Sequence, residues 1–329
     1  MQSVNVRRRV VLLAAGAAAA STCSPLLAQG STFPSRPITL VVGYPPGGST
    51  DLTARVLGEQ LARVLGQPVV IENVGGAGGA LGAQRVAQVQ ADGHTLLLGS
   101  NNEMAIAGLV NPALRYDPLK QFTPIGLVAS QPMVLVAGSH TGTRDVPSFI
   151  AKVKQAPGKY SYGSSGVGTA LNLAGEMVKQ SAGLFIVHIP YRGVGPLATD
   201  LMGGQLEYGV FVLSSALPHI AAGKVFALGV TERQRSAVTP DIPALSEAPQ
   251  LRNVDIGTWF GLWGPAGMPA AVGQRLQAAL LESLKAPELV RKLVASGSTI
   301  ADGSTALASF QATEIEKYRR IVQQANIRL

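Results

Sequence analysis

Cysteine is almost absent from this sequence. Its 329 residues include a single cysteine, Cys23, which excludes an internal disulfide framework and a zinc site built from several thiolates. Charged residues are also scarce, at 14%, whereas 47% of the residues are hydrophobic, and this balance excludes intrinsic disorder. The chain is too long for one typical core, so we expect two lobes of roughly 100–150 residues each.

A long apolar run is missing as well, and the most apolar short run lies at the N-terminus. Residues 7–9 are three arginines, residues 10–20 are apolar, and residues 26–28 offer a small-residue cleavage site. This pattern predicts a signal peptide over residues 1–28 that also removes Cys23. Because the run is too short to cross a bilayer core of about 30 Å, we expect the mature protein to be soluble.

Neither sign of charge dominates strongly. Three of the 27 basic residues lie in the predicted signal peptide, which leaves 24 basic against 19 acidic residues and a net charge of +5. This mild excess favours anionic partners, but no run of Lys and Arg indicates nucleic-acid binding. Since the histidines are scattered without metal-ligand spacing, we expect neither a metal nor a cofactor; they are His94, His140, His188 and His219.

The hydrophobic pattern predicts a first α/β unit near the N-terminus. Residues 37–43 form a near-continuous apolar run, typical of a strand buried on both faces, and residues 68–72 and 94–99 are similar. Helices are expected at about 52–65 and after the glycine loop 75–82. This β-α-β-α-β order implies right-handed crossovers and a parallel sheet.

A comparable alternation restarts after residue 132 and predicts a second α/β unit. The expected strands are 133–137, 160–163, 185–189, 206–212 and 226–230, and the expected helices are 147–155, 169–181 and 197–202.

The C-terminal segment differs, because helices dominate it. Helical stretches are expected at 270–284, 287–295 and 306–324. These helices need an apolar face to cover, and the first sheet offers one, so we expect the chain to cross between the lobes more than once. The predicted fold is therefore α/β with two lobes, each a mostly parallel sheet flanked by helices: lobe 1 comprises residues 29–132 and 255–329, and lobe 2 comprises residues 133–254.

One glycine-rich loop follows a strand in each predicted lobe. The loop from Tyr44 to Asp51 contains two glycines, which let the backbone approach a ligand, and Ser49 or Thr50 as a helix N-cap. The loop 164–169 repeats this arrangement. Ligands of open parallel sheets lie beyond the carboxyl ends of the strands, near helix N-termini, so each loop could bind a carboxylate. Loops of this kind are also common as plain turns.

No catalytic constellation is visible, and we expect no enzyme. Residues 163–167 resemble a nucleophile elbow but have Val167 where that motif needs glycine, and residues 76–81 fail the dinucleotide fingerprint at Leu81. Asp51 is interpreted as a loop anchor, since no second ionisable group lies near it in the motif.

Two side chains after the predicted strand 185–189 face the expected cleft. Arg192 could pair with a second carboxylate or make a salt bridge at the rim. Tyr191, like Tyr44, could form a wall for the ligand or contribute only loop packing. Trp259 and Trp263 indicate core or hinge packing.

Several segments together resemble the substrate receptors of tripartite tricarboxylate transporters, the Bug family of periplasmic binding proteins. The segments are Y-P-P-G-G-S-T-D at 44–51, E-N-V-G-G-A-G-G-A-L-G at 72–82, A-D-G-H-T-L-L-L at 91–98, Y-G-S-S-G-V-G-T at 162–169, H-I-P-Y-R-G at 188–193 and W-G-P-A-G-M-P at 263–269.

The resemblance implies a Venus flytrap that closes on a carboxylate between its two glycine loops, with a membrane permease as partner. It implies a periplasmic protein, and we expect a monomer that takes a small organic acid or amino acid. The candidate ligand-binding residues are Tyr44, Pro46, Gly47, Gly48, Ser49, Thr50, Asp51, Ser164, Ser165, Gly166, Gly168, Thr169, Tyr191, Arg192, Gly193, Leu213 and Ser214. A ligand sensor for signalling and a periplasmic enzyme acting on organic acids stay open as alternatives.

Overall fold

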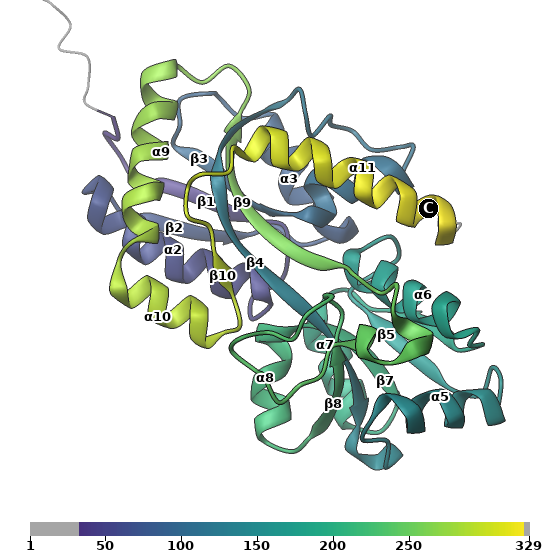
Figure 1. Ribbon diagram of the computed structural model, residues 1–329. Helices are drawn as coiled ribbons and strands as arrows, with labels where there is room; N and C mark the ends of the chain where they lie inside the picture. The colour runs from purple at the N-terminus through teal and green to yellow at the C-terminus, as the bar shows by residue number, and fades with distance from the viewer. Residues whose placement is uncertain (1–32, 326–329) are drawn as a thin grey trace, which may run out of the picture.

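A curled mixed sheet runs through the whole molecule in the computed structural model, which describes residues 33–325. The predicted signal peptide lies outside the described residues. The strand order is β2-β1-β3-β9-β4-β7-β5-β6, and β8 and β10 both pair with β4. Helices flank the sheet in two halves, which β4 and β9 connect (Figure 1). None of the helices between residues 33 and 325 combines the length and the apolar character that a membrane crossing needs.

The first half contains the parallel strands that the sequence predicts. β1 (Ile38–Val42) lies between β2 (Val69–Asn73) and β3 (Thr95–Ser100) and pairs in parallel with both. Its apolar run is buried because α2 (Ser49–Leu65) covers one face of the sheet and α3 (Ala80–Ala87) covers the other.

The long strand β4 (Phe122–Gly138) carries the chain from one half to the other. Through Pro132 it pairs with β9 (Gly257–Pro265), and from Met133 it pairs with β7 (Tyr208–Val212) and, from Val134, with β8 (Val225–Val230). The predicted strand 133–137 is thus only the second part of β4, and β9 was not predicted. The predicted lobe boundaries fall close to these changes of pairing partner and remain a prediction.

The second half has its own parallel strands, β7, β5 and β6, in that order. Its strands and helices include two differences from expectation: α7 starts three residues before the predicted helix 197–202, and α8 contains Pro218 and was not predicted. The elements are β5 (Ser161–Ser164), β6 (Val187–Pro190), α5 (Val146–Gln155), α6 (Ala170–Ala182), α7 (Val194–Met202) and α8 (Leu213–Ala221).

The C-terminal helices return to the first half, as predicted. α9 (Ala270–Leu284) and α10 (Pro287–Ala295) have the predicted bounds and share a buried cluster with α2 and β1. The short strand β10 (Thr299–Ile300) then pairs with β4. The remaining short elements are η1 (Ala77–Gly79), η2 (Asn102–Ile106), α4 (Ala107–Val110), η3 (Ser139–Thr141), η4 (Leu245–Glu247) and η5 (Pro249–Leu251).

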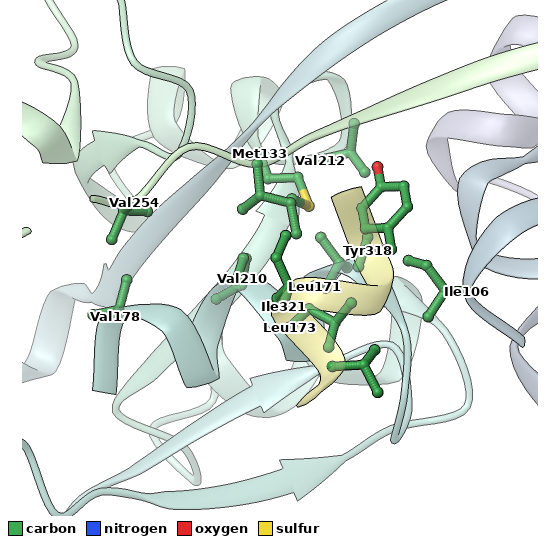
Figure 2. Packing of buried hydrophobic residues seen from close by; sticks show 14 of the residues in the cluster. Ile106, Met133, Leu171, Leu173, Val178, Val210, Val212, Val254, Tyr318 and Ile321 are labelled. Carbon is green, nitrogen blue, oxygen red and sulfur yellow. The ribbon is translucent and has the colours of Figure 1, made fainter. Parts of the chain in front are cut away.

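The last helix, α11 (Leu307–Ala325), packs against both halves. Tyr318 and Ile321 of this helix lie near Ile106 of η2 in the first half and near Leu171 and Leu173 of α6 in the second (Figure 2). One hydrophobic cluster therefore continues across the boundary between the halves, and α11 belongs to it.

Candidate ligand-binding site

A cavity of about 170 Å³ lies between the two halves. It is many times larger than the roughly 10–15 Å³ that a single water needs, so it has room for a small organic molecule. The lining residues come from both halves and are Tyr44, Pro45, Pro46, Gly48, Ser49, Thr50, Ser100, Asn102, Met133, Ser165, Ala170, Leu171, Arg192, Gly193, Val194, Gly195, Pro196, Val212, Thr258 and Phe260.

The first glycine loop brings the N-terminus of α2 to this cavity. The N-cap is Gly48 and makes no side-chain capping bond, so the prediction of Ser49 or Thr50 as the cap was wrong. Both residues instead occupy the first helical turn. The first backbone N–H groups of a helix have no partner within it, and without a capping side chain those of Ser49 and Thr50 remain available to a ligand.

Asp51 holds this loop in place, as expected. One carboxylate oxygen accepts hydrogen bonds from Gly47 N and Arg55 Nε, both at 2.9 Å, and the other accepts from Asn73 Nδ2 at 2.9 Å. Burial alone would raise the pKa of Asp51, but these hydrogen bonds outweigh it and lower the pKa. Asp51 does not line the cavity, so its charge stabilises the loop rather than facing a ligand.

Two helices of the second half also begin at the cavity. α7 has Gly193 as its N-cap and no capping side chain, and Gly193, Val194 and Gly195 line the cavity. Gly193 has a φ of 105°, which a residue with a side chain rarely adopts. α6 contributes Ala170 and Leu171. Since helix N-termini carry partial positive charge, their convergence on one cavity favours an anion.

Eight of the seventeen candidate residues line the cavity and nine do not. Those that do are Tyr44, Pro46, Gly48, Ser49, Thr50, Ser165, Arg192 and Gly193. The other nine lie behind the wall or elsewhere, and they are Gly47, Asp51, Ser164, Gly166, Gly168, Thr169, Tyr191, Leu213 and Ser214.

Hydrogen bonds explain where several of these nine side chains lie. Thr169 caps α6 by accepting from Asn172 N, and Tyr191 Oη donates to Asp200 Oδ2 at 2.8 Å. Ser214 Oγ donates to Gln131 Oε1 at 2.7 Å, close to where β4 passes between the halves. The structure therefore gives these side chains partners within the protein and does not place them on the cavity wall.

Ser164 and His188 form a contact that the sequence did not indicate. Ser164 Oγ lies 2.7 Å from His188 Nε2, the distance of a nucleophile from its base. The pair differs from a catalytic one in two respects. The side chain of Ser164 is fully buried and does not line the cavity, and no carboxylate among the described residues forms a hydrogen bond with His188. Burial lowers the pKa of His188 to about 4, so the ring is neutral at pH 7.

Ser100 and Asn102 line the cavity and were missed by the sequence analysis. Asn102 Oδ1 accepts a hydrogen bond from Ala170 N at 2.7 Å and thereby joins η2 in the first half to the start of α6 in the second. Asn102 Nδ2 donates to Tyr44 Oη, also at 2.7 Å. The only sequence signal was their position at the carboxyl end of a buried strand.

The charge on the cavity wall comes from one side chain. Arg192 is the only cationic residue among the lining residues that the structure describes, and no Asp or Glu is among them. No group of three His, Cys, Asp or Glu side chains suited to a metal occurs within residues 33–325. Much of the remaining wall is apolar, from Met133, Leu171, Val212 and Phe260. The cavity is therefore suited to an anionic group attached to an uncharged body.

The comparison with protein families agrees with this geometry. Residues 53–327 match the family model described as the tripartite tricarboxylate transporter family receptor. The chain belongs to this receptor family. Protein BugT of Bordetella pertussis is 32% identical to this receptor over 328 residues, which are 99% of this chain and 100% of BugT.

Solved structures give the same result for the fold. A structure of MatC from Rhodopseudomonas palustris with bound malate superposes with a TM-score of 0.83 at 32% identity, over 88% of the receptor and 100% of MatC. Another R. palustris protein, solved with adipate, has a TM-score of 0.87 at 29% identity and covers 90% of the receptor and 99% of its own chain. The receptor thus has the two-lobed α/β fold of periplasmic binding proteins.

Proposed function

We propose that the protein is a periplasmic receptor that captures a small carboxylate between its two lobes and presents it to the membrane subunits of a tripartite tricarboxylate-type transporter. The observation that carries this proposal is the convergence of uncapped helix N-termini from both halves, α2 and α7, on one cavity. Malate and adipate, which are bound in the two similar structures, are small dicarboxylates and support the same ligand class.

Capture follows from contacts made to both lobes at once. A carboxylate held by amides of α2 and α7 binds the closed form better than the open form and shifts the population toward closure. The permease would then recognise the closed shape. Export through the predicted signal peptide would deliver the mature receptor, as a monomer, to the periplasm, and the protein performs no chemistry on its ligand.

The first test measures binding of a panel of acids to the mature chain from Gln29. Adipate, malate, benzoate and aspartate are each titrated by thermal shift and calorimetry, with adipamide as the uncharged control. A ligand present at a hundred times its Kd should raise the stability by about 2.7 kcal/mol. If no acid shifts the melting temperature, the receptor proposal is contradicted. Recovery of the bound acid chemically changed after long incubation would instead indicate an enzyme.

A single backbone amide tests how the anion is held. Ser49 is the first residue of α2, a position where proline fits a helix but removes the N–H. We expect Ser49→Pro to weaken binding of the best acid roughly tenfold to a hundredfold, the value of a charge-assisted hydrogen bond. Ser49→Ala keeps the amide and should bind nearly as the parent does.

The matched control is Ala270→Pro, the same substitution at the first residue of α9, which does not line the cavity. It should leave affinity unchanged. Equal affinities for Ser49→Pro and Ser49→Ala would show that the amide takes no part in binding.

A further inference from the structure

Glu103 lies directly behind the cavity wall and is fully buried. It sits in η2, between the lining residues Ser100 and Asn102 on one side and Tyr44 on the other. Its Oε1 accepts a hydrogen bond from Ser100 N at 2.6 Å, and its Oε2 lies 2.7 Å from Ser100 Oγ and 3.0 Å from Tyr44 Oη. No Lys, Arg or His within residues 33–325 forms an ion pair with Glu103.

A chain of hydrogen bonds leads from Glu103 to the second half of the molecule. A backbone N–H can only donate, so Ala170 fixes the Asn102 amide with its oxygen toward α6 and its nitrogen toward Tyr44. Tyr44 Oη therefore accepts from Asn102, and its single hydrogen points elsewhere. Three contacts, through Tyr44 and Asn102, thus connect Glu103 to the first residue of α6.

The contacts around Glu103 need one more hydrogen than the hydroxyl groups supply. Tyr44 Oη lies 2.7 Å from the carbonyl oxygen of Gly78 as well as 3.0 Å from Glu103 Oε2, and Ser100 Oγ forms the third close contact. Each of these three oxygen–oxygen contacts requires a hydrogen between its atoms. The two hydroxyl groups provide two, and the carbonyl of Gly78 has none. Tyr44 Oη thus faces two acceptors with one hydrogen. A proton on the carboxyl group of Glu103 would supply the third hydrogen, because Glu103 could then donate to Tyr44 while Tyr44 donates to Gly78.

The surroundings of Glu103 agree with a proton on this group. Burial raises the pKa of Glu103 to about 7, although the hydrogen bonds that Ser100 and Tyr44 can donate to the ionised carboxylate act to lower it. The titratable side chains around η2 are tyrosines: Tyr44, Tyr116, whose hydroxyl donates to the backbone oxygen of Glu103, and Tyr318, which contacts the neighbouring Asn101. Burial raises the pKa of all three, so they stay neutral where Glu103 titrates.

We propose that Glu103 is a positioning residue that works as a neutral acid, and that its proton couples the capture of an anionic ligand to the placement of Tyr44 and Asn102. This inference rests on the proposed function. When Glu103 loses its proton, Tyr44 has one hydrogen for two acceptors, and the contact to Gly78 competes with the contact to Glu103. The new negative charge also lies just behind the wall that holds the carboxylate. Both effects weaken binding, so affinity falls as the pH rises through the pKa of Glu103.

The test measures the titration of the Glu103 carboxyl group and the affinity for adipate as functions of pH. Carboxyl ¹³C NMR of glutamate-labelled protein should show a resonance, missing in Glu103→Gln, with a midpoint near neutrality. Adding adipate should raise this midpoint by half to one unit, and the Kd of adipate should rise about threefold to tenfold between pH 6 and pH 8. Glu103→Gln keeps an uncharged donor and acceptor and should bind at both pH values as the parent does at pH 6. Glu103→Ala should bind weakly at both.

Glu232→Gln is the matched control, since burial also raises the pKa of the partly buried Glu232, which forms no hydrogen bond with Tyr44, Ser100 or Asn102. It should retain the pH dependence of the parent. The inference is overturned if the titration midpoint of the Glu103 carboxyl group lies below pH 5. This midpoint can be measured in the protein without ligand. An unchanged pH dependence in Glu103→Gln also overturns the inference. If adipate fails to bind at any pH, that result concerns the proposed ligand, while the midpoint still decides whether Glu103 holds a proton.

Discussion

At the scale of single residues, the role of Arg192 has two alternatives that an experiment can separate. Its side chain is exposed, lines the cavity, and forms no hydrogen bond or ion pair with the described residues. Either it stays a solvated rim group or it contacts a second anionic group of the ligand. The structure places it beside the N-terminus of α7, where an anion is already favoured. A ligand with two carboxylates could therefore engage the helix N-termini and Arg192 together.

We predict that Arg192→Gln separates two acids of the same chain length. Adipate has two carboxylates and hexanoate has one. The substitution should therefore weaken the binding of adipate about threefold to tenfold and leave the binding of hexanoate nearly unchanged. The expected loss is small because an exposed charge pair contributes little to the binding free energy. Calorimetry on both acids gives the ratio. Arg252→Gln, an exposed arginine that does not line the cavity, serves as the control. An equal loss for both acids would assign Arg192 to general attraction of anions.

The sequence predicted the glycine loops better than it predicted individual side chains. Asp51 could be assigned as an anchor because its loop position and first-turn location were visible in the motif. The partners of Tyr191 and Ser214 could not, since Asp200 and Gln131 approach them only in the folded chain. Glu103 was missed for the same reason: an isolated acid in a polar segment looks like a surface residue until its burial is known.

At the scale of elements, the η1 turn depends on a glycine that touches the Glu103 cluster. A Cβ on Gly79 would lie 2.6 Å from Glu103 Oε2 and 2.9 Å from Tyr44 Oη, and the residue has a φ of 97°. Any side chain here must displace the groups that order the cavity wall. The G-G-A-G-G segment therefore has a structural requirement that a generic turn lacks.

Gly79→Ala should lower the free energy of unfolding by about 2–4 kcal/mol, from the clash together with the backbone strain. Gly267→Ala is the matched control, because Gly267 has a similar φ of 86° but no atom within 4 Å of a Cβ built there. It should cost only about 1–2 kcal/mol. Urea denaturation of both variants measures the difference. Equal costs would mean that the Gly79 site adapts without strain.

Elements with an uninterrupted apolar run or a regular helical spacing were predicted well, and strands whose apolar pattern is interrupted were not. The apolar runs of β1 and β3 and the helical spacing of α9 and α10 are sufficient to predict these elements from the sequence. β4 contains two prolines and a polar Ser-Gln pair, which hid its first part, and the segment of β9 was interpreted as core or hinge packing around its tryptophans. Tertiary pairing outweighs local propensity in such strands.

At the scale of the whole molecule, the two halves touch around the mouth of the cavity. A Cβ built on Gly48, before α2, would lie 3.6 Å from Cγ2 of Val194, at the start of α7. Both residues line the cavity. The described conformation therefore brings the two helix N-termini close enough for a covalent link.

We predict that Gly48→Cys combined with Val194→Cys locks the receptor closed on oxidation. The oxidised protein should no longer take up adipate on a timescale of hours, and dithiothreitol should restore uptake. Because the chain carries no cysteine after Cys23, the two new thiols have no competitors in the mature protein. Each single cysteine variant is the control and should bind under both conditions. Normal uptake by the oxidised double variant would show that closure is not needed to enclose the ligand.

The continuity of β4 sets what kind of motion the molecule can make. Its pairing is free of register shifts from Ala129 to Leu135, the stretch that passes from one half to the other, with irregularities only beyond each end. Such a ribbon, hydrogen-bonded to β9 on one side of the boundary and to β7 on the other, resists sliding but yields to twist. We expect the two halves to rotate about β4 as a hinge, so that binding of any ligand leads to the same closed conformation. Under the proposed function, the membrane subunits would then recognise this closed shape, which does not depend on which acid is bound.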